Sequence, residues 1–431
     1  MDRFNLSRAA LSVCLAVALL PGCGVLRQAQ DDMQPPVAPD SIPVAPGALP
    51  MGHTASSKYQ VLYRFGISRV GHDGSYPMDP VLYFNGTFYG TTYAGGFSLK
   101  CRSCMYGVVF ALSPSGSGKV LHRFVGSDGF WPYGGLTALH GNLYGTTNEA
   151  GYGAGNVFRI SPSGAFRVLY DFNSSSGANA SGPYGNLTAV NGTLYGTTSA
   201  GGPKDDGTVY SINTHGKIHL LHTFTGPDGA TPLAGLLDVD GTLYGTTIAG
   251  GAHKKGTVFR ISTTGEQKVL FSFDGTDGGG PTAPVIAVNG KLYGTTQYGG
   301  SSGWGTVFSM TMNGEDETVL HNFSYDSGDG ARPEGGLIDV DGTLYGTTAR
   351  GGIGNASLCQ GTCGTIFSVT MSGKETVLHQ FENGYKNDGS FPVANLIEVK
   401  GRLYGTTEFG GYSPNCGSYP CYRGTVFEFT P

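Results

Sequence analysis

Leu-Tyr-Gly-Thr-Thr stands at residues 143–147, and the chain repeats this motif six more times. The other copies lie at 88–92, where Phe replaces the leucine, and at 194–198, 243–247, 292–296, 344–348 and 403–407. Successive copies are about 50 residues apart, which is the spacing of a tandem-repeat architecture. The repeats therefore predict one body of seven similar units, although 431 residues could otherwise fill two or three domains.

Four short elements recur in the same order in every unit. One unit contains them at residues 235–241, 243–247, 256–261 and 269–273. Each is rich in β-branched and aromatic residues and is bounded by turn residues, which indicates strands. Asn-Gly, Asp-Gly, His-Gly or Lys-Gly separates the first two strands, and most of these pairs are favoured hairpin turns. The sequence therefore predicts an all-β, seven-bladed β-propeller of four-stranded antiparallel blades.

The phase of the repeats predicts how the ring closes. We name the strands of a blade A, B, C and D from the centre of the ring outward. The folded region begins with a lone D strand at 61–65 and ends with a lone A-B-C set at 394–429. The first strand is therefore expected to complete the last blade, which leaves no edge unpaired. In strand B, we expect the motif's tyrosine to fill the gap between blades and its glycine to let the neighbouring blade approach.

The first 57 residues are expected to lie outside the propeller. Residues 1–22 have the pattern of a lipoprotein-type signal peptide, because two arginines precede an apolar run too short to span a bilayer. The run ends in Leu-Pro-Gly-Cys, which resembles a bacterial lipobox and predicts lipidation of Cys23; an ordinary secretory signal with a chance cysteine is the alternative. Residues 23–57 hold six prolines, typical of a disordered tether, and residues 58–431 form the predicted propeller.

Composition and net charge limit the classes of partner that the protein can have. Glycine supplies 73 of the 431 residues, which suits short strands and tight turns and argues against helices. The net charge of −5 provides no basic surface for nucleic acid. We expect membrane contact through the lipid anchor only, no nucleic-acid partner, no cofactor and a monomeric chain.

The combined motifs resemble a known family. Gly-Thr-Val-Phe, Val-Leu-His-x-Phe, Asp-Gly-x-x-Pro and Gly-Leu-x-x-Val-Asp-Gly-Thr-Leu-Tyr-Gly-Thr-Thr are similar to the Gloeo/Verruco repeat (GloVer) of tandem-repeat bacterial surface proteins. The resemblance covers about residues 59–430, with a departure at 174–181, where the usual Asp-Gly is missing. It implies an exported protein at the cell envelope or cell surface. The family has no defined activity, so the resemblance transfers no catalytic residues.

Cysteine, histidine and aspartate recur in patterns that each have more than one interpretation. Close cysteine pairs between strands B and C predict disulfides in an exported protein, with redox or metal chemistry as alternatives. These pairs are Cys101 and Cys104, Cys359 and Cys363, and Cys416 and Cys421. One position of strand D holds His122, His222, His321 and His379, and Tyr or Phe elsewhere, so we interpret it as a packing position. Asp-Gly pairs before proline in the D–A loops predict turns, with calcium binding as the alternative.

The candidate binding surface is the face that carries the D–A and B–C loops. Strand directions place these loops together and put the tight A–B and C–D turns on the other face. The first face has the length variation and most of the loop aromatics, and variable loops on a rigid scaffold commonly carry binding residues. The candidate ligand-binding residues are Tyr76, Trp131, Tyr133, Tyr184, Trp304, Phe391, Asp128, Asp228, Asp329 and Asp388.

The leading functional hypothesis is a lipid-anchored, non-enzymatic binding module for a glycan, peptide or protein. The sequence contains no Gly-x-Ser-x-Gly elbow, metal-spaced His/Glu group or phosphate-binding glycine loop, which favours binding over catalysis. Two alternatives stay open, because propellers host many functions. One is an exported lyase or hydrolase that uses Asp and Tyr at the channel mouth, and the other is a purely structural envelope protein.

Overall fold

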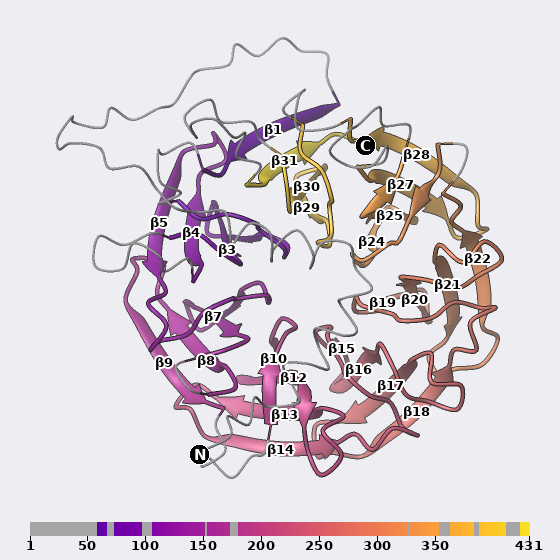
Figure 1. The fold of residues 1–431 in the computed structure, drawn as a ribbon, viewed down its shortest axis with the longest axis horizontal. Coiled ribbons are helices and arrows are strands. Elements are labelled where there is room, and N and C mark those ends of the chain that lie inside the picture. Colours follow the sequence, from indigo (N-terminus) through magenta and orange to yellow (C-terminus); the bar gives the residue numbers. More distant parts are fainter. Residues whose placement is uncertain are drawn as a thin grey trace, which may run out of the picture. The chain divides into compact units, whose positions relative to one another are not determined.

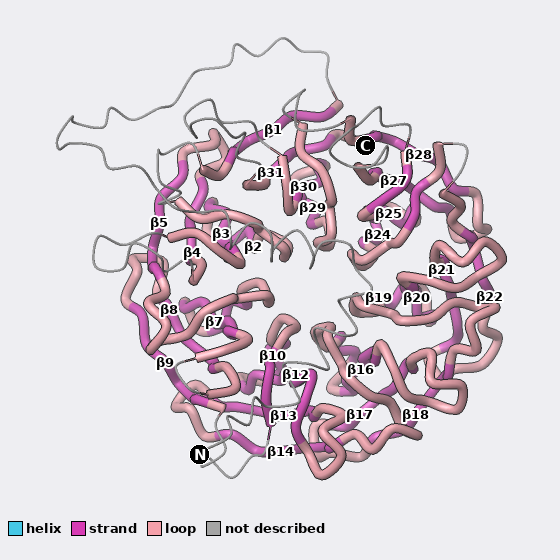
Figure 2. Tube along the Cα trace, viewed as in Figure 1, coloured by secondary structure: helices cyan, strands magenta, loops and turns pink. Residues whose placement is uncertain are grey.

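A computed structural model describes residues 58–66, 73–96, 106–150, 153–172, 180–325, 328–352, 363–382, 388–410 and 423–431. The chain divides into two units, Met1–His53 and Thr54–Pro431, and all described residues belong to the second. That unit is a ring of seven antiparallel blades, so the predicted β-propeller is confirmed (Figure 1). Strands and loops make up all of the described residues (Figure 2), which accordingly contain no helix that could span a membrane.

We number the blades 1–7 in chain order. The A strands, nearest the centre, are β2 (Leu82–Phe84), β6 (Thr137–Leu139), β11 (Thr188–Val190), β15 (Leu237–Val239), β19 (Ile286–Val288), β24 (Ile338–Val340) and β29 (Ile397–Val399). The B strands are β3 (Thr87–Thr92), β7 (Asn142–Thr147), β12 (Thr193–Gly201), β16 (Thr242–Thr247), β20 (Lys291–Thr296), β25 (Thr343–Thr348) and β30 (Arg402–Thr407).

The outer half of each blade consists of strands C and D. The C strands are β4 (Val108–Leu112), β8 (Asn156–Ile160), β13 (Thr208–Asn213), β17 (Thr257–Ser262), β21 (Thr306–Thr311), β27 (Thr365–Thr370) and β31 (Thr425–Phe429). The D strands are β5 (Gly118–Arg123), β9 (Phe166–Asp171), β14 (Ile218–Thr223), β18 (Gln267–Ser272), β22 (Thr318–Asn322), β28 (Glu375–Gln380) and β1 (Tyr59–Arg64). Three short strands belong to the D–A and B–C loops: β10 (Ala180–Pro183), β23 (Gly330–Ala331) and β26 (Arg350–Gly351).

The ring closes as the repeat phase predicted. Strand β1 pairs antiparallel with β31, from Tyr59 opposite Phe429 to Arg64 opposite Thr425. The last blade therefore has the strand order β1-β31-β30-β29. Blade 3 departs from the four-stranded pattern, because β10 also pairs with the long strand β12.

The A–B hairpins explain the recurring Asn-Gly and Asp-Gly pairs. Both central turn residues have positive φ, for example Asn85 (49°) with Gly86 (81°) and Asp240 (51°) with Gly241 (81°). That is the type I′ geometry, which matches the twist of the flanking strands and which Asn, Asp and Gly adopt most readily.

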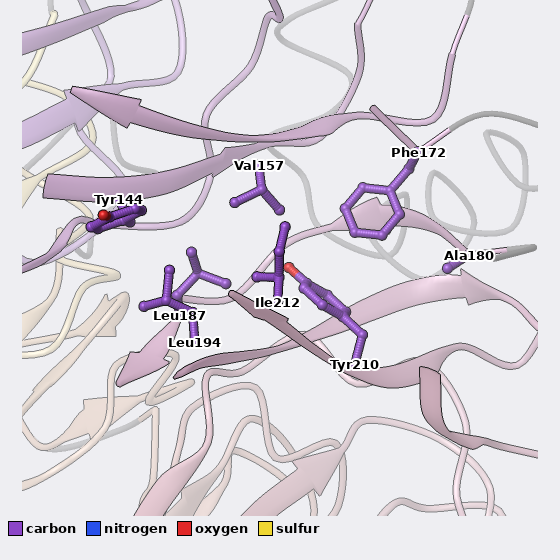
Figure 3. Close-up of a cluster of buried hydrophobic side chains, with 8 residues drawn as sticks. All are labelled: Tyr144, Val157, Phe172, Ala180, Leu187, Leu194, Tyr210 and Ile212. Carbon is purple, nitrogen blue, oxygen red and sulfur yellow. The ribbon is translucent and has the colours of Figure 1, made fainter. Parts of the chain in front are cut away.

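The core lies between blades rather than within them. Figure 3 shows one such interface, in which Tyr144 and Phe172 of blade 2 face Leu194, Tyr210 and Ile212 of blade 3. These five side chains are at most 1% exposed. The prediction that the motif's tyrosine fills the gap between blades is confirmed.

The motif's glycine has a different role from the one expected. A Cβ atom at Gly245 would lie 2.5 Å from Cζ of Phe259, the residue opposite it on strand C of the same blade. The Phe259 ring in turn makes an edge contact with Phe224 of blade 3, with 5.2 Å between centroids. The glycine therefore makes room for a ring of its own blade, and that ring contacts the neighbouring blade.

The two threonines of the motif bind backbone and side chains at the blade interface. In six blades the first threonine donates a hydrogen bond to a carbonyl of the next blade, as Thr246 does to Ala283 at 3.0 Å. The corresponding bond from Thr406 to Asp79, at 3.1 Å, joins the last blade to the first. In five blades the second threonine pairs with a hydroxyl at the start of strand C, as in Thr247 with Thr257 at 2.8 Å. Blade 2 is the exception to both patterns, because the hydroxyls of Thr146 and Thr147 have no hydrogen-bond partner there. Each position of the motif thus has a structural reason to recur.

We expect Gly245→Ala to destabilise the propeller by about 1–3 kcal/mol, because the new methyl group must displace the buried ring of Phe259 or the buried side chain of Leu236. Urea unfolding of the variant and the parent measures this loss. Ala287→Gly, on strand A of the next blade, leaves both of these side chains in place and serves as a control for a change of backbone freedom. An unchanged midpoint in Gly245→Ala would contradict the close fit.

Candidate functional site

The D–A loops are held between two blades by backbone hydrogen bonds. In the loop before β6, the N–H of Trp131 donates to Tyr106 O at 3.0 Å, and the N–H of Asn148 donates to Trp131 O at 3.1 Å. Tyr106 precedes strand C of blade 1, and Asn148 follows strand B of blade 2. Short antiparallel pairings between D–A and B–C loops recur around the ring, including Ser75 with Ala94, Phe130 with Glu149, Ala230 with Ala249 and Ser390 with Phe409. The prediction that these loops share one face is confirmed.

The residue before the loop proline has a left-handed backbone in every blade. The φ values are 59° at Tyr76, 57° at Trp131, 65° at Gly182, 55° at Thr231, 58° at Gly280, 55° at Arg332 and 56° at Phe391. Five of these seven residues carry a side chain, and non-glycine residues in this region cost about 1–3 kcal/mol and cluster at functional sites. Hydrogen bonds to both blades hold these residues in this conformation.

A group of aromatic rings extends over the first three blades at the start of their A strands. Tyr133 stacks on Tyr184 with 4.1 Å between centroids and 19° between planes. Tyr93 lies 4.8 Å from Tyr133 and 5.6 Å from Trp131. We call these four residues the tyrosine–tryptophan group. All four keep partly exposed surface, so their rings are available for contact.

Two carboxylates near the tyrosines come from blades 6 and 7. Glu334, in the loop before β24, accepts a hydrogen bond from Gln297 Nε2 at 2.9 Å, and its Oε1 lies 4.0 Å from Nε of Arg332. Glu408 follows β30. Burial, together with the charge of Glu334, raises the pKa of Glu408 to about 8 against the opposing charge of Arg350. The side chain of Glu334 remains 20% exposed, so water reaches the group.

Electrostatic effects place the carboxylates close to the tyrosines. Burial raises the pKa of Tyr184 well above its usual value, and the charges of Asp79 and Glu334 raise it further. The charge of Glu408 raises the pKa of Tyr133 as well, after burial and the neighbouring tyrosines. Because Coulomb interactions weaken with distance, the side chains of blades 1, 2, 3, 6 and 7 converge at the centre of this face.

The structure brings some predicted aromatic residues together and separates others. Trp131, Tyr133 and Tyr184 belong to one group. Tyr76 and Phe391 each contact Phe409 edge-on, with 5.4 Å between centroids, and the guanidinium of Arg350 lies 5.1 Å from the centroid of the Phe391 ring. Trp304 packs against Tyr325 at 4.7 Å and is 36% exposed. No contact joins Trp304 to the tyrosine–tryptophan group among the described residues.

The four predicted aspartates pair with strand D instead. Each lies near Nε2 of a strand-D histidine: Asp128 with His122 at 3.0 Å, Asp228 with His222 at 2.9 Å, Asp329 with His321 at 3.3 Å, and Asp388 with His379 at 3.5 Å. Strand D is the outermost strand, so these aspartates do not contribute to the central group. The histidines also pack as expected, since His122 stacks on Phe166 at 3.7 Å.

Sequence reasoning missed several central residues, although two repeat positions mark them. Of the missed residues, Glu334 follows the loop proline, as the predicted Tyr133 and Tyr184 do, and Tyr93, Gln297 and Glu408 each follow the second threonine of the motif. Comparing these two positions across the seven units would have found them.

The structure describes Cys363 and no other cysteine of the three predicted pairs. Cys363 is fully buried, and its backbone carbonyl accepts a hydrogen bond from the N–H of Phe391 at 2.9 Å. The other five cysteines and Cys23 lie outside the described residues, so the pairings remain predictions.

Several solved structures are similar to this chain. They include TolB from Acinetobacter baumannii (14% identity, 69% of this chain, 65% of that chain, TM-score 0.38) and a candidate 6-phosphogluconolactonase from Bacteroides uniformis (13%, 74%, 89%, 0.46). A third similar structure comes from a study of two prolyl endopeptidases (13% identity, 84% of this chain, 51% of that chain, TM-score 0.46). This chain spans less than two thirds of the TolB and prolyl endopeptidase chains. These similarities carry no argument about function.

Sequence comparison identifies the repeat itself. No curated protein matches the chain. The profile of the Gloeobacter/Verrucomicrobia repeat matches residues 47–182, 176–360 and 249–431, which together include the whole propeller. The chain therefore belongs to the Gloeobacter/Verrucomicrobia repeat family.

Proposed function

We propose that this protein is an exported binding module that holds a glycan at the centre of its D–A/B–C face. The observation that carries the proposal is the stacking of Tyr133 on Tyr184 near the carboxylates of blades 6 and 7. Flat aromatic faces suit the C–H face of a sugar ring, and polar side chains suit its hydroxyl groups. Arg332 and Arg350 lie near these carboxylates, which reduces the net charge of the site and favours a neutral ligand.

The proposal places the module outside the cytoplasm. Residues 1–22 direct export, Cys23 carries the lipid anchor, residues 23–57 form the tether, and residues 58–431 bind the ligand. The lipobox-like sequence before Cys23 supports this assignment. The paired cysteines of the B–C loops, as disulfides, suit the same oxidising location.

Tyr184→Ala is expected to weaken glycan binding by roughly 30-fold, because losing a central aromatic contact typically costs about 2 kcal/mol. Neutral oligosaccharides from envelope and plant polysaccharides are first screened by thermal shift, since a ligand of the native state raises the melting temperature. Calorimetric titration of any hit then compares the variants. Trp304→Ala is the matched control, because it removes an exposed ring outside the tyrosine–tryptophan group. A flat screen, or equal losses in both variants, would contradict the proposal.

An exported hydrolase or lyase is the second candidate, and the closeness of Glu334 to Glu408 favours it. Their charges interact and burial raises the pKa of Glu408 to about 8, so one carboxyl can be protonated while the other is ionised. Such a pair can act as general acid and base. Turnover of a bound oligosaccharide that disappears in Glu408→Gln, with binding retained, would establish the enzyme; binding without turnover supports the non-enzymatic module.

A further inference from the structure

Three potential metal ligands meet between the outer strands of blades 5 and 6. His321 lies on β22, Asp329 in the following loop, and Glu375 at the start of β28, and Figure 1 shows β22 and β28 on the rim of the ring. One ligand atom from each lies within 4.8 Å of the others. Within the described part of the chain, no other group of three His, Cys, Asp or Glu side chains meets this condition.

One carboxylate oxygen of the half-buried Glu375 lacks a partner. Its Oε1 is buried without a hydrogen bond. Burial, together with the charge of Asp329, raises the pKa of Glu375 to about 7 against the opposing effect of His321. A buried carboxylate without a partner is costly, and a bound cation would remove that cost.

The other two side chains are positioned for coordination. Asp329 accepts hydrogen bonds from the backbone N–H groups of Ser324 at 2.9 Å and Gly330 at 2.6 Å. These bonds orient its carboxylate, as hydrogen bonds to metal ligands commonly do. Nε2 of His321 lies 3.3 and 3.4 Å from the two carboxylate oxygens. Ligands at about 2.0–2.2 Å from a tetrahedral ion are roughly 3.3 Å apart, so only Glu375 has to move closer.

We propose that His321, Asp329 and Glu375 bind one Zn²⁺ ion that joins blades 5 and 6, with water completing the coordination. An imidazole with two carboxylates is a nitrogen–oxygen set that suits zinc, whereas calcium takes oxygen ligands alone. The site is separate from the central group of the D–A/B–C face and does not depend on the proposed glycan.

The other blade interfaces serve as internal comparisons. At the interface of blades 3 and 4, His222 and Asp228 face Gln267, which occupies the register position of Glu375. At the interface of blades 4 and 5, Asp277 lies near Glu317, but Phe271 replaces the histidine. The complete set of three ligands occurs at the interface of blades 5 and 6 alone among the described residues.

The test is calorimetric titration of the full, tag-free chain with ZnCl₂, together with melting in EDTA and in zinc. The parent is expected to bind one Zn²⁺ and to melt at a higher temperature with zinc than in EDTA. Glu375→Gln should weaken binding at least 10- to 100-fold, the loss typical of even a supporting residue, while still melting cooperatively in EDTA. Gln267→Glu should bind a second Zn²⁺, because it completes the set around His222 and Asp228.

Two results would overturn the proposal. One is a parent chain that takes up no zinc and shows no zinc-dependent shift in melting temperature. The other is equal zinc binding by the parent, Glu375→Gln and Gln267→Glu, which would place the ion elsewhere, for example at the cysteines.

Discussion

A chain that begins at residue 67 is expected to show no cooperative unfolding transition, whereas a chain that begins at residue 58 unfolds like the parent. The nine residues removed between these two variants contain β1, which is the outer strand of blade 7. Without it, β31 becomes the outer strand of blade 7 and has an unpaired edge. An exposed edge of this kind favours association with other chains.

The side chains of β1 join three blades, which is why the expected effect is so large. Phe65, just after β1, is fully buried and makes an edge contact with Phe110 of blade 1, with 5.1 Å between centroids. Tyr59 stacks on His379 of blade 6 at 4.1 Å. Removing one buried phenylalanine costs about 3–5 kcal/mol, and whole domains are commonly stable by only about 5–15 kcal/mol.

Calorimetry on the two truncated chains measures this effect directly. Phe65→Ala tests the same contact with a smaller change than the truncation. We expect it to lower the free energy of unfolding by about 3–5 kcal/mol. A cooperative transition near the parent melting temperature in the chain that begins at residue 67 would show that the ring does not need β1.

The repeat predicts most of the fold from the sequence alone. Turn pairs such as Asn85-Gly86 adopt the positive φ angles that the hairpin prediction requires, and β1 closes the last blade as the phase indicated. These features follow from local sequence, because turn chemistry and strand alternation act over a few residues. Seven copies also average out the ambiguity of any single strand.

The central site was less predictable, because its residues meet only through the closed ring. Glu334 and Glu408 belong to different blades, and nothing near either residue in the sequence indicates the other. The histidine–aspartate pairs were also missed, although His122 and Asp128 are six residues apart, as are His222 and Asp228. Taken separately, the histidine pattern indicates packing and the aspartate pattern indicates turns or a binding face, and the folded loop is what brings the two side chains together.

The second large effect is a pH dependence of stability that comes from Glu408. The folded protein holds a proton on Glu408 up to about pH 8, whereas an unfolded glutamate releases it near pH 4.5. Between these values the folded state binds more protons than the unfolded state, so the contribution of Glu408 to the free energy of unfolding falls as the pH rises. Below about pH 4.5 both states are protonated and the contribution vanishes. Above about pH 8 the full cost of the buried charge is present.

Glu408→Gln is therefore expected to be more stable than the parent at pH 9 and equally stable near pH 4.5. The difference at pH 9 should be about 1–3 kcal/mol, less than the pKa shift alone would give, because water reaches this part of the site. Urea unfolding at pH 4.5, 7 and 9 measures it. Glu315→Gln, at an exposed turn, should keep the pH dependence of the parent. Parallel stability curves for the parent and Glu408→Gln would mean that folding does not raise the pKa of Glu408, and the central carboxylates would then lack, at neutral pH, the protonated partner that acid–base chemistry at this site requires.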